Sequence, residues 1–149
     1  MTALPNPISL PRAQRLLQRE HLRVVPAVGD GWCVVAPNAS YALSIENGCV
    51  LQLRGQWNGF AHDSELFHRL REVVATCNAT RAFPKAYLWP LKDRGHYGLM
   101  AESSMLYDGD LTSAQFHEFL DLGLTSLRDF FLDAEAALPE LVTWEEDDV

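Results

Sequence analysis

Five histidines are the first residues whose chemistry could define a site. A zinc site on a helix needs two histidines four residues apart with a third ligand nearby. His62 and His68 are six positions apart, and His117 has no second histidine in its turn. Asp108 and Asp110 bring two carboxylates together, but two ligands are too few for calcium, and a helix dipole already favours acids at this place. The spacing of these residues therefore predicts no bound metal.

The sequence contains no motif that is typical of nucleophilic catalysis. A serine hydrolase needs a Gly-x-Ser-x-Gly turn, which does not occur, and Gly29-Asp30-Gly31 is too short to cradle a phosphate. The three cysteines, Cys33, Cys49 and Cys77, form no Cys-x-x-Cys pair. Two lie in predicted apolar strands and the third near a predicted helix C-terminus, so we expect buried structural thiols. The sequence predicts no catalytic residue and no cofactor.

The charge is unevenly distributed along the chain. The net charge is −8, with seven Lys or Arg against six Asp or Glu in residues 1–75, and five against fourteen in residues 76–149. An acidic surface repels phosphate and gains no affinity from counterion release, so nucleic acid is not expected as a partner. The alternative is that these acids only keep a helix face and the C-terminal tail in solution.

Length and composition favour one soluble domain. A chain of 149 residues, 48% of them hydrophobic, is long enough to bury a core without disulfides. No apolar run approaches the roughly 20 residues of a membrane span, so we expect a cytoplasmic protein without a membrane partner. Three prolines predict an extended N-terminal arm over residues 1–11. A single domain is expected over residues 12–139 and an acidic tail over residues 140–149.

The first half of the chain predicts one helix followed by strands. Apolar residues at helical spacing predict a helix over residues 12–23. The period then changes to two, which predicts strands over residues 32–36, 41–46 and 49–57. The dipeptide Asn47-Gly48 between the last two segments is a strong signal for a two-residue hairpin turn, because both residues tolerate positive φ.

The second half predicts a helix, a strand pair and a long final helix. Asp63 is placed to cap the first of these helices, which must end before Pro84. Strands are expected over residues 86–93 and 95–106. Thr112 with Gln115 forms a capping-box pattern, and apolar residues then recur every three or four positions up to residue 138. The expected fold is α+β, with an antiparallel sheet of about five strands and three helices in the order α-β-β-β-α-β-β-α.

A family pattern follows in the same half of the chain. In this pattern, Asn-x-x-Arg-x-Phe-Pro-Lys-Ala-Tyr leads into a strand pair and then into a final amphipathic helix. The matching residues are Asn78, Arg81, Phe83, Pro84, Lys85, Ala86 and Tyr87. Over residues 10–138 the chain thereby resembles the YbjN-like family of bacterial sensory transduction regulators, especially its actinobacterial members. The resemblance implies a fold like that of type III secretion chaperones, an α+β dimer that binds protein partners.

Asn78, Arg81 and Lys85 are the candidate binding residues. The guanidinium group of Arg81 offers bidentate geometry to a carboxylate, so these residues could dock an acidic partner. Alternatively, Asn78 caps the preceding helix, Phe83 fills the core, and the two basic side chains pair with nearby acids.

The final helix carries an apolar band that is too wide for one sheet to cover. This excess predicts a second buried face and hence a homodimer, with Leu122 and Phe130 in the interface. The alternative is that the whole band serves the core. The expected function is a non-enzymatic regulatory or chaperone-like module that binds an unidentified protein partner. The competing function is a small-molecule-binding or weakly enzymatic α+β domain.

Overall fold

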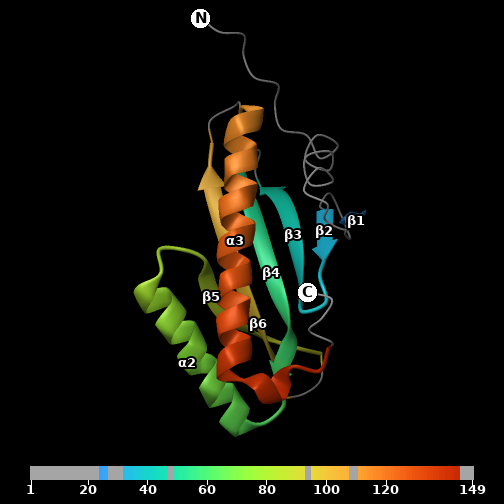
Figure 1. Cartoon of the computed structure of the whole chain (residues 1–149), viewed down its shortest axis with the longest axis vertical. Helices are drawn as coiled ribbons and strands as arrows, with labels where there is room; N and C mark the ends of the chain where they lie inside the picture. Colours follow the sequence, from blue (N-terminus) through green and yellow to red (C-terminus); the bar gives the residue numbers. More distant parts are fainter. Residues whose placement is uncertain (1–23, 27–31, 47–48, 93–94, 108–110, 145–149) are drawn as a thin grey trace, which may run out of the picture.

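The computed structural model describes residues 24–26, 32–46, 49–92, 95–107 and 111–144. Two helices, α2 and α3, cover one face of a six-stranded antiparallel sheet with the strand order β1-β2-β3-β4-β6-β5 (Figure 1). The elements along the chain are β1 (Val24–Pro26), β2 (Trp32–Val35), β3 (Ala39–Glu46), β4 (Val50–Ala61), α2 (Ser64–Thr80), β5 (Lys85–Pro90), β6 (Tyr97–Leu106), α3 (Ser113–Ala137) and the 3-10 helix η1 (Pro139–Leu141).

The α+β class and the antiparallel sheet are confirmed. Five strands have four or more residues, as expected, and the three-residue strand β1 extends the sheet at one edge. The described part of the chain contains two α-helices where three were expected. The predicted helix over residues 12–23 lies outside the described residues, as do the predicted arm over residues 1–11 and residues 145–149 of the tail.

The hairpin predicted around Asn47-Gly48 is formed by β3 and β4. Glu46 pairs with Val50, so three residues separate the strands, one more than in the predicted turn. Cys49 lies in this connection and is exposed. The prediction of a buried thiol at Cys49 is therefore wrong, because Cys49 belongs to the connection between β3 and β4 and not to either strand.

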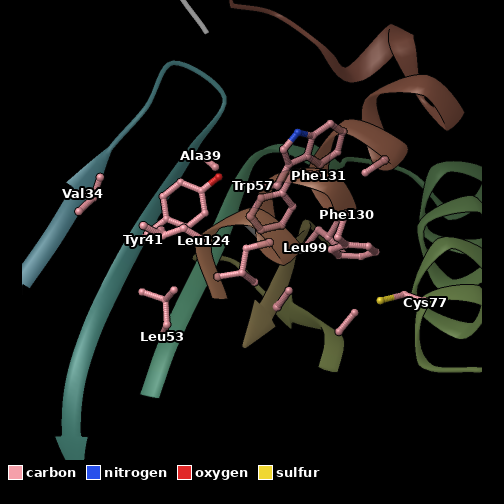
Figure 2. Packing of buried hydrophobic residues seen from close by; sticks show 14 of the residues in the cluster. Val34, Ala39, Tyr41, Leu53, Trp57, Cys77, Leu99, Leu124, Phe130 and Phe131 are labelled. Carbon is pink, nitrogen blue, oxygen red and sulfur yellow. The ribbon is translucent and has the colours of Figure 1, made fainter. Parts of the chain in front are cut away.

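The core lies between the sheet and the two helices. The rings of Tyr41 and Phe131 meet there with their centroids 6.0 Å apart (Figure 2). Gly55 allows this contact, since a Cβ atom at that position would lie 2.7 Å from Cε2 of Phe131. The close approach brings α3 directly onto β4. The largest fully buried side chains are Trp57, Tyr41, Phe116, Phe130, Phe131, Leu43, Leu51, Leu53, Leu70, Leu99 and Leu120.

Residues after α3 complete this core. Leu141 is buried, and Trp144 packs edge-on against Trp57 with ring centroids 5.7 Å apart. Near the end of α3 itself, the Glu135 side chain accepts hydrogen bonds from Nε1 of the same Trp57 at 3.4 Å and from Nδ2 of Asn38 at 3.1 Å. Residues up to Trp144 therefore pack against the core.

The Tyr41 side chain places a polar hydroxyl group in this core, and its effect on stability can be measured. Its hydroxyl is buried and has no hydrogen-bond partner within the described residues, and burial raises the pKa of Tyr41 to about 12. An unpartnered buried hydroxyl costs about 1–3 kcal/mol in proteins, so Tyr41→Phe should leave the free energy of unfolding at pH 7 unchanged or raised.

The same substitution should change the alkaline pH dependence. Between pH 10 and 12 the unfolded state loses the Tyr41 proton while the folded state keeps it, so the stability of the wild-type chain falls as the pH rises. Urea melts from pH 9 to 12 should show a shallower fall for Tyr41→Phe. If the free energy of unfolding falls equally with pH in both proteins, the raised pKa of Tyr41 is contradicted.

Candidate functional site

Asn78 joins the end of α2 to the edge strand β5. Its Oδ1 accepts a hydrogen bond from the Ala86 N–H at 2.9 Å, and its Nδ2 donates to the Ala86 carbonyl at 3.0 Å. Just after β5, the Leu91 N–H donates to the His96 carbonyl, so the backbone groups of Leu91 face β6. Every second residue faces the same side, so the N–H and C=O of Ala86 face away from β6, toward the open edge of the sheet. The amide of Asn78 thus takes the place of a neighbouring strand and covers this sheet edge.

Two arginines connect α2 to the C-terminal part of the chain. Arg81 forms an ion pair with Asp133 of α3, and Arg69 forms one with Glu140 and donates to the Ala137 carbonyl at 2.9 Å. Both arginines line a cavity of about 450 Å³ between α2 and α3. Each guanidinium group already faces a carboxylate, as the alternative interpretation of the sequence expected for Arg81.

The three predicted binding residues therefore have different surroundings. The side chains of Asn78 and Arg81 make contacts within the subunit. Lys85 is exposed at the start of β5, across from Glu102 on β6. Docking of a partner on these residues stays a prediction, and Lys85 is the member whose side chain is exposed.

Cys77 lines the same cavity as a structural thiol. Its Sγ donates a hydrogen bond to the Pro84 carbonyl at 3.4 Å, and burial raises the pKa of the thiol. A thiol that stays protonated is a poor nucleophile. The expectation of a buried, structural cysteine is confirmed at this position.

A second cavity, of about 310 Å³, lies between the first half of α3 and the end of β6. We call it the α3–β6 groove. Its lining residues are Phe83, Ser103, Ser104, Met105, Gln115, Glu118, Phe119, Leu122 and Gly123. Most of the lining surface is apolar, and Glu118 is the one charged residue in this set. The groove is therefore suited to apolar contacts.

Local and long-range contacts hold α3 over this groove. Oγ1 of Thr112 accepts a hydrogen bond from the Gln115 N–H at 3.0 Å, and Oε1 of Gln115 accepts one from the Thr112 N–H at 2.9 Å. These bonds confirm the predicted capping box. Gly123 faces the sheet, where a Cβ atom would lie 3.0 Å from Cδ2 of Leu53. The glycine thus allows the helix to lie close to β4.

Phe83 and Leu122 contribute exposed side chains to the groove. Their exposed fractions are 53% and 52%, respectively. The expectation that Phe83 fills the core is wrong, because this ring lines the open α3–β6 groove. Phe130, in contrast, is 1% exposed and lies on the side of α3 that faces Cys77 and α2 (Figure 2). Of the two residues predicted to lie in a dimer interface, Leu122 has an exposed side chain and Phe130 serves the core.

The sequence did not identify the groove. Phe119 belongs to the wide apolar band from which a dimer face was predicted, and Met105 fits an ordinary strand pattern, so neither residue pointed to a groove between α3 and β6. One usable signal was present, since the predicted strand over residues 95–106 is longer than its predicted partner over residues 86–93. Unequal lengths leave the end of the longer strand without a neighbour on that side.

Other candidate chemistry finds no support in the part of the chain that the structure describes. No three His, Cys, Asp or Glu side chains there come together in a way that could hold a metal ion. Asp108 and Asp110 lie outside the described residues. Among the described helices, none has the length and apolar character needed to cross a membrane.

Comparisons with known proteins agree with this fold. A family model named YbjN, with the description "Putative bacterial sensory transduction regulator", matches residues 29–136. Among solved structures, the fold is similar to the crystal structure of YbjN, "a putative transcription regulator from E. coli", with a TM-score of 0.71 and 15% identity over 90% of this chain and 96% of that chain. No curated protein matches the chain. Because the family model spans more than half of the sequence, the chain belongs to the YbjN family.

Proposed function

We propose that this chain is a regulatory module without enzymatic activity of its own that binds a protein partner in the α3–β6 groove. The observation that carries the proposal is the exposed apolar surface of Phe83 and Leu122 beside the apolar lining of the groove. Apolar patches of this kind on a soluble domain mark sites of protein contact. The regulator description of the family supports the same class of function.

A protein partner fits the groove better than a small molecule does. Small-molecule sites enclose most of the ligand and direct several polar groups at it. The α3–β6 groove is open to solvent at Phe83 and Leu122, and Glu118 supplies the one charged side chain of its lining. The surface thus resembles an exposed apolar patch that is covered when a protein partner binds.

Three further expectations belong to this proposal. We expect the type III secretion chaperone-like fold, the homodimer and the cytoplasmic location that the sequence suggested. Leu122 is half exposed, so this predicted interface residue is available either to the protein partner or to a second copy, but not to both at once. Oligomeric state is therefore measured together with partner binding.

Leu122→Glu should strongly weaken partner binding, because it places an unpaired carboxylate in an apolar contact. We expect at least a tenfold loss of the partner protein that the tagged wild-type chain captures from lysate of its own bacterium. Leu132→Glu is the matched control, because Leu132 is also an exposed leucine of α3, 49% exposed, but is not part of the groove lining. Both variants should melt within a few degrees of the wild type, as surface substitutions do.

Equal capture by the two variants would contradict the proposed site. Sedimentation velocity at micromolar concentration reports the oligomeric state, and a homodimer has twice the monomer mass of 16.7 kDa. A dimer that Leu122→Glu dissociates would show that a second copy fills the groove. A specific thermal shift with a metabolite, lost in Leu122→Glu, would favour the small-molecule alternative.

A further inference from the structure

The two strands beside the groove differ in length. β5 pairs with β6 from Lys85 opposite Glu102 to Pro90 opposite Tyr97, and β6 continues to Leu106. The segment Ser103–Leu106 therefore has β4 as a neighbour on one side and, within the described residues, no strand on the other (Figure 1).

The hydrogen-bond pattern shows which backbone groups face the open side. The Tyr107 N–H donates to the Cys49 carbonyl at 2.9 Å, so Tyr107 faces β4. Residues of an antiparallel strand alternate in the side to which they direct both backbone groups. Met105 therefore also faces β4, whereas Ser104 and Leu106 direct their N–H and C=O groups to the open side. Both residues are exposed, and the exposed fraction of Leu106 is 80%.

This open edge lies directly beside the α3–β6 groove. Ser104 and Met105 belong both to the edge and to the groove lining, and Phe119 and Leu122 of α3 lie across from them. A strand that paired with this edge would direct alternate side chains toward α3 and hence into the groove. Its other side chains would lie on the face of the sheet where Gln52 donates to Oγ of Ser104 at 3.3 Å.

The charge around the groove limits the composition of such a strand. Glu118 is the charged residue of the lining, and Asp121 lies three residues later on the same side of α3. From residue 113 to residue 127, α3 has these two acids and no Lys or Arg. A partner segment with Lys or Arg beside its apolar residues is complementary to this surface.

We propose that an extended segment of a partner protein, with alternating apolar residues and flanking Lys or Arg, adds as a strand to the Ser104–Leu106 edge and places its apolar side chains in the α3–β6 groove. Strand addition of this kind takes affinity from main-chain hydrogen bonds and specificity from pockets for alternate side chains. The proposal rests on the protein-binding function above and names its ligand. A second copy is a poorer occupant, because a contact of this edge and groove with itself would bring Glu118 and Asp121 of the two copies together, and like charges oppose such a contact.

A phage-displayed library of random twelve-residue peptides is the probe. Selection on the wild-type chain should enrich peptides with alternating apolar residues and basic flanks. Methylating one backbone nitrogen at a time in a selected peptide should weaken binding at every second position, because alternate residues of an added strand donate to β6. Losses at neighbouring positions, or at positions spaced three and four apart, would indicate a turn or a helix and overturn the proposal.

Ser104→Pro tests the protein side of the same contact. Proline removes the outward N–H of Ser104 and is tolerated on an edge strand where this group faces solvent. We expect at least tenfold weaker binding of the selected peptide, whereas Ser104→Ala, which keeps the N–H, should bind within about threefold of the wild type. Thermal melts establish that both variants fold. If Ser104→Pro does not fold, the methylation scan decides the question alone.

The results distinguish this inference from the proposed function. Suppose that the selected peptides bind Ser104→Pro but not Leu122→Glu, and that the methylation scan shows no loss at every second position. The groove would then remain a binding site, and strand addition would be overturned. Peptides insensitive to both substitutions would overturn both proposals. If no peptide is selected, and the wild-type chain self-associates whereas Ser104→Pro is monomeric, the edge binds a second copy. That result would overturn the choice of partner.

Discussion

Phe131→Ala should lower the free energy of unfolding by about 3–5 kcal/mol, the usual cost of truncating a fully buried phenylalanine. Phe131 is 0% exposed, and its ring lies against Tyr41. It also occupies the space above Gly55, where a Cβ atom would lie 2.7 Å from the ring. Because glycine has no side chain that could move into the vacated space, the cavity should persist.

The neighbouring residue provides the control for this prediction. Leu132 is 49% exposed, so Leu132→Ala should change the free energy of unfolding by no more than about 0.5 kcal/mol. Urea denaturation followed by circular dichroism measures both variants. Equal effects of the two substitutions would contradict the packing of α3 described here.

Asn78→Ala should lower the free energy of unfolding by about 2–3 kcal/mol, because it leaves the N–H and C=O of Ala86 without their partners. Ala86 is 2% exposed, so water reaches these groups poorly. Asn78→Asp keeps the acceptor for the Ala86 N–H and loses the donor to its carbonyl, so we expect an intermediate loss. Chemical denaturation of the purified variants at pH 7 measures the three values.

Arg81→Ala is the contrasting change in the same segment. Its ion pair with Asp133 is partly exposed, and such pairs contribute about 0–1 kcal/mol. A loss in Arg81→Ala as large as that in Asn78→Ala would contradict this ranking. Undiminished stability of Asn78→Ala with weaker partner binding would instead return Asn78 to the set of docking residues.

In the part of the chain that the structure describes, backbone groups at the edge of the sheet are satisfied on β5 but not at the end of β6. An edge strand presents backbone groups that pair readily with other chains. On β5 the amide of Asn78 satisfies these groups at Ala86. On β6 the corresponding groups of Ser104 and Leu106 have no strand beside them within the described residues. The end of β6 is therefore the part of this edge at which a partner strand can pair.

The sequence by itself determined the features that depend on neighbours along the chain. The alternation around Asn47-Gly48 predicted the β3–β4 hairpin, and Thr112 with Gln115 predicted the start of α3. Asp63 caps α2 as expected, accepting a hydrogen bond from the Leu66 N–H at 2.8 Å. Each of these signals acts over a few residues, so no knowledge of distant segments is needed.

The tertiary structure alone decided which apolar and basic residues are available to a partner. Phe130 and Leu122 belong to one helix, yet α2 covers the first and leaves the second exposed. Arg81 meets Asp133 across 52 positions of sequence. The α3–β6 groove arises because β6 extends past Lys85, the first residue of β5, and α3, which follows later in the chain, packs beside this unpaired part of β6. Burial and exposure depend on which distant segments pack together, and periodicity along one segment does not contain that information.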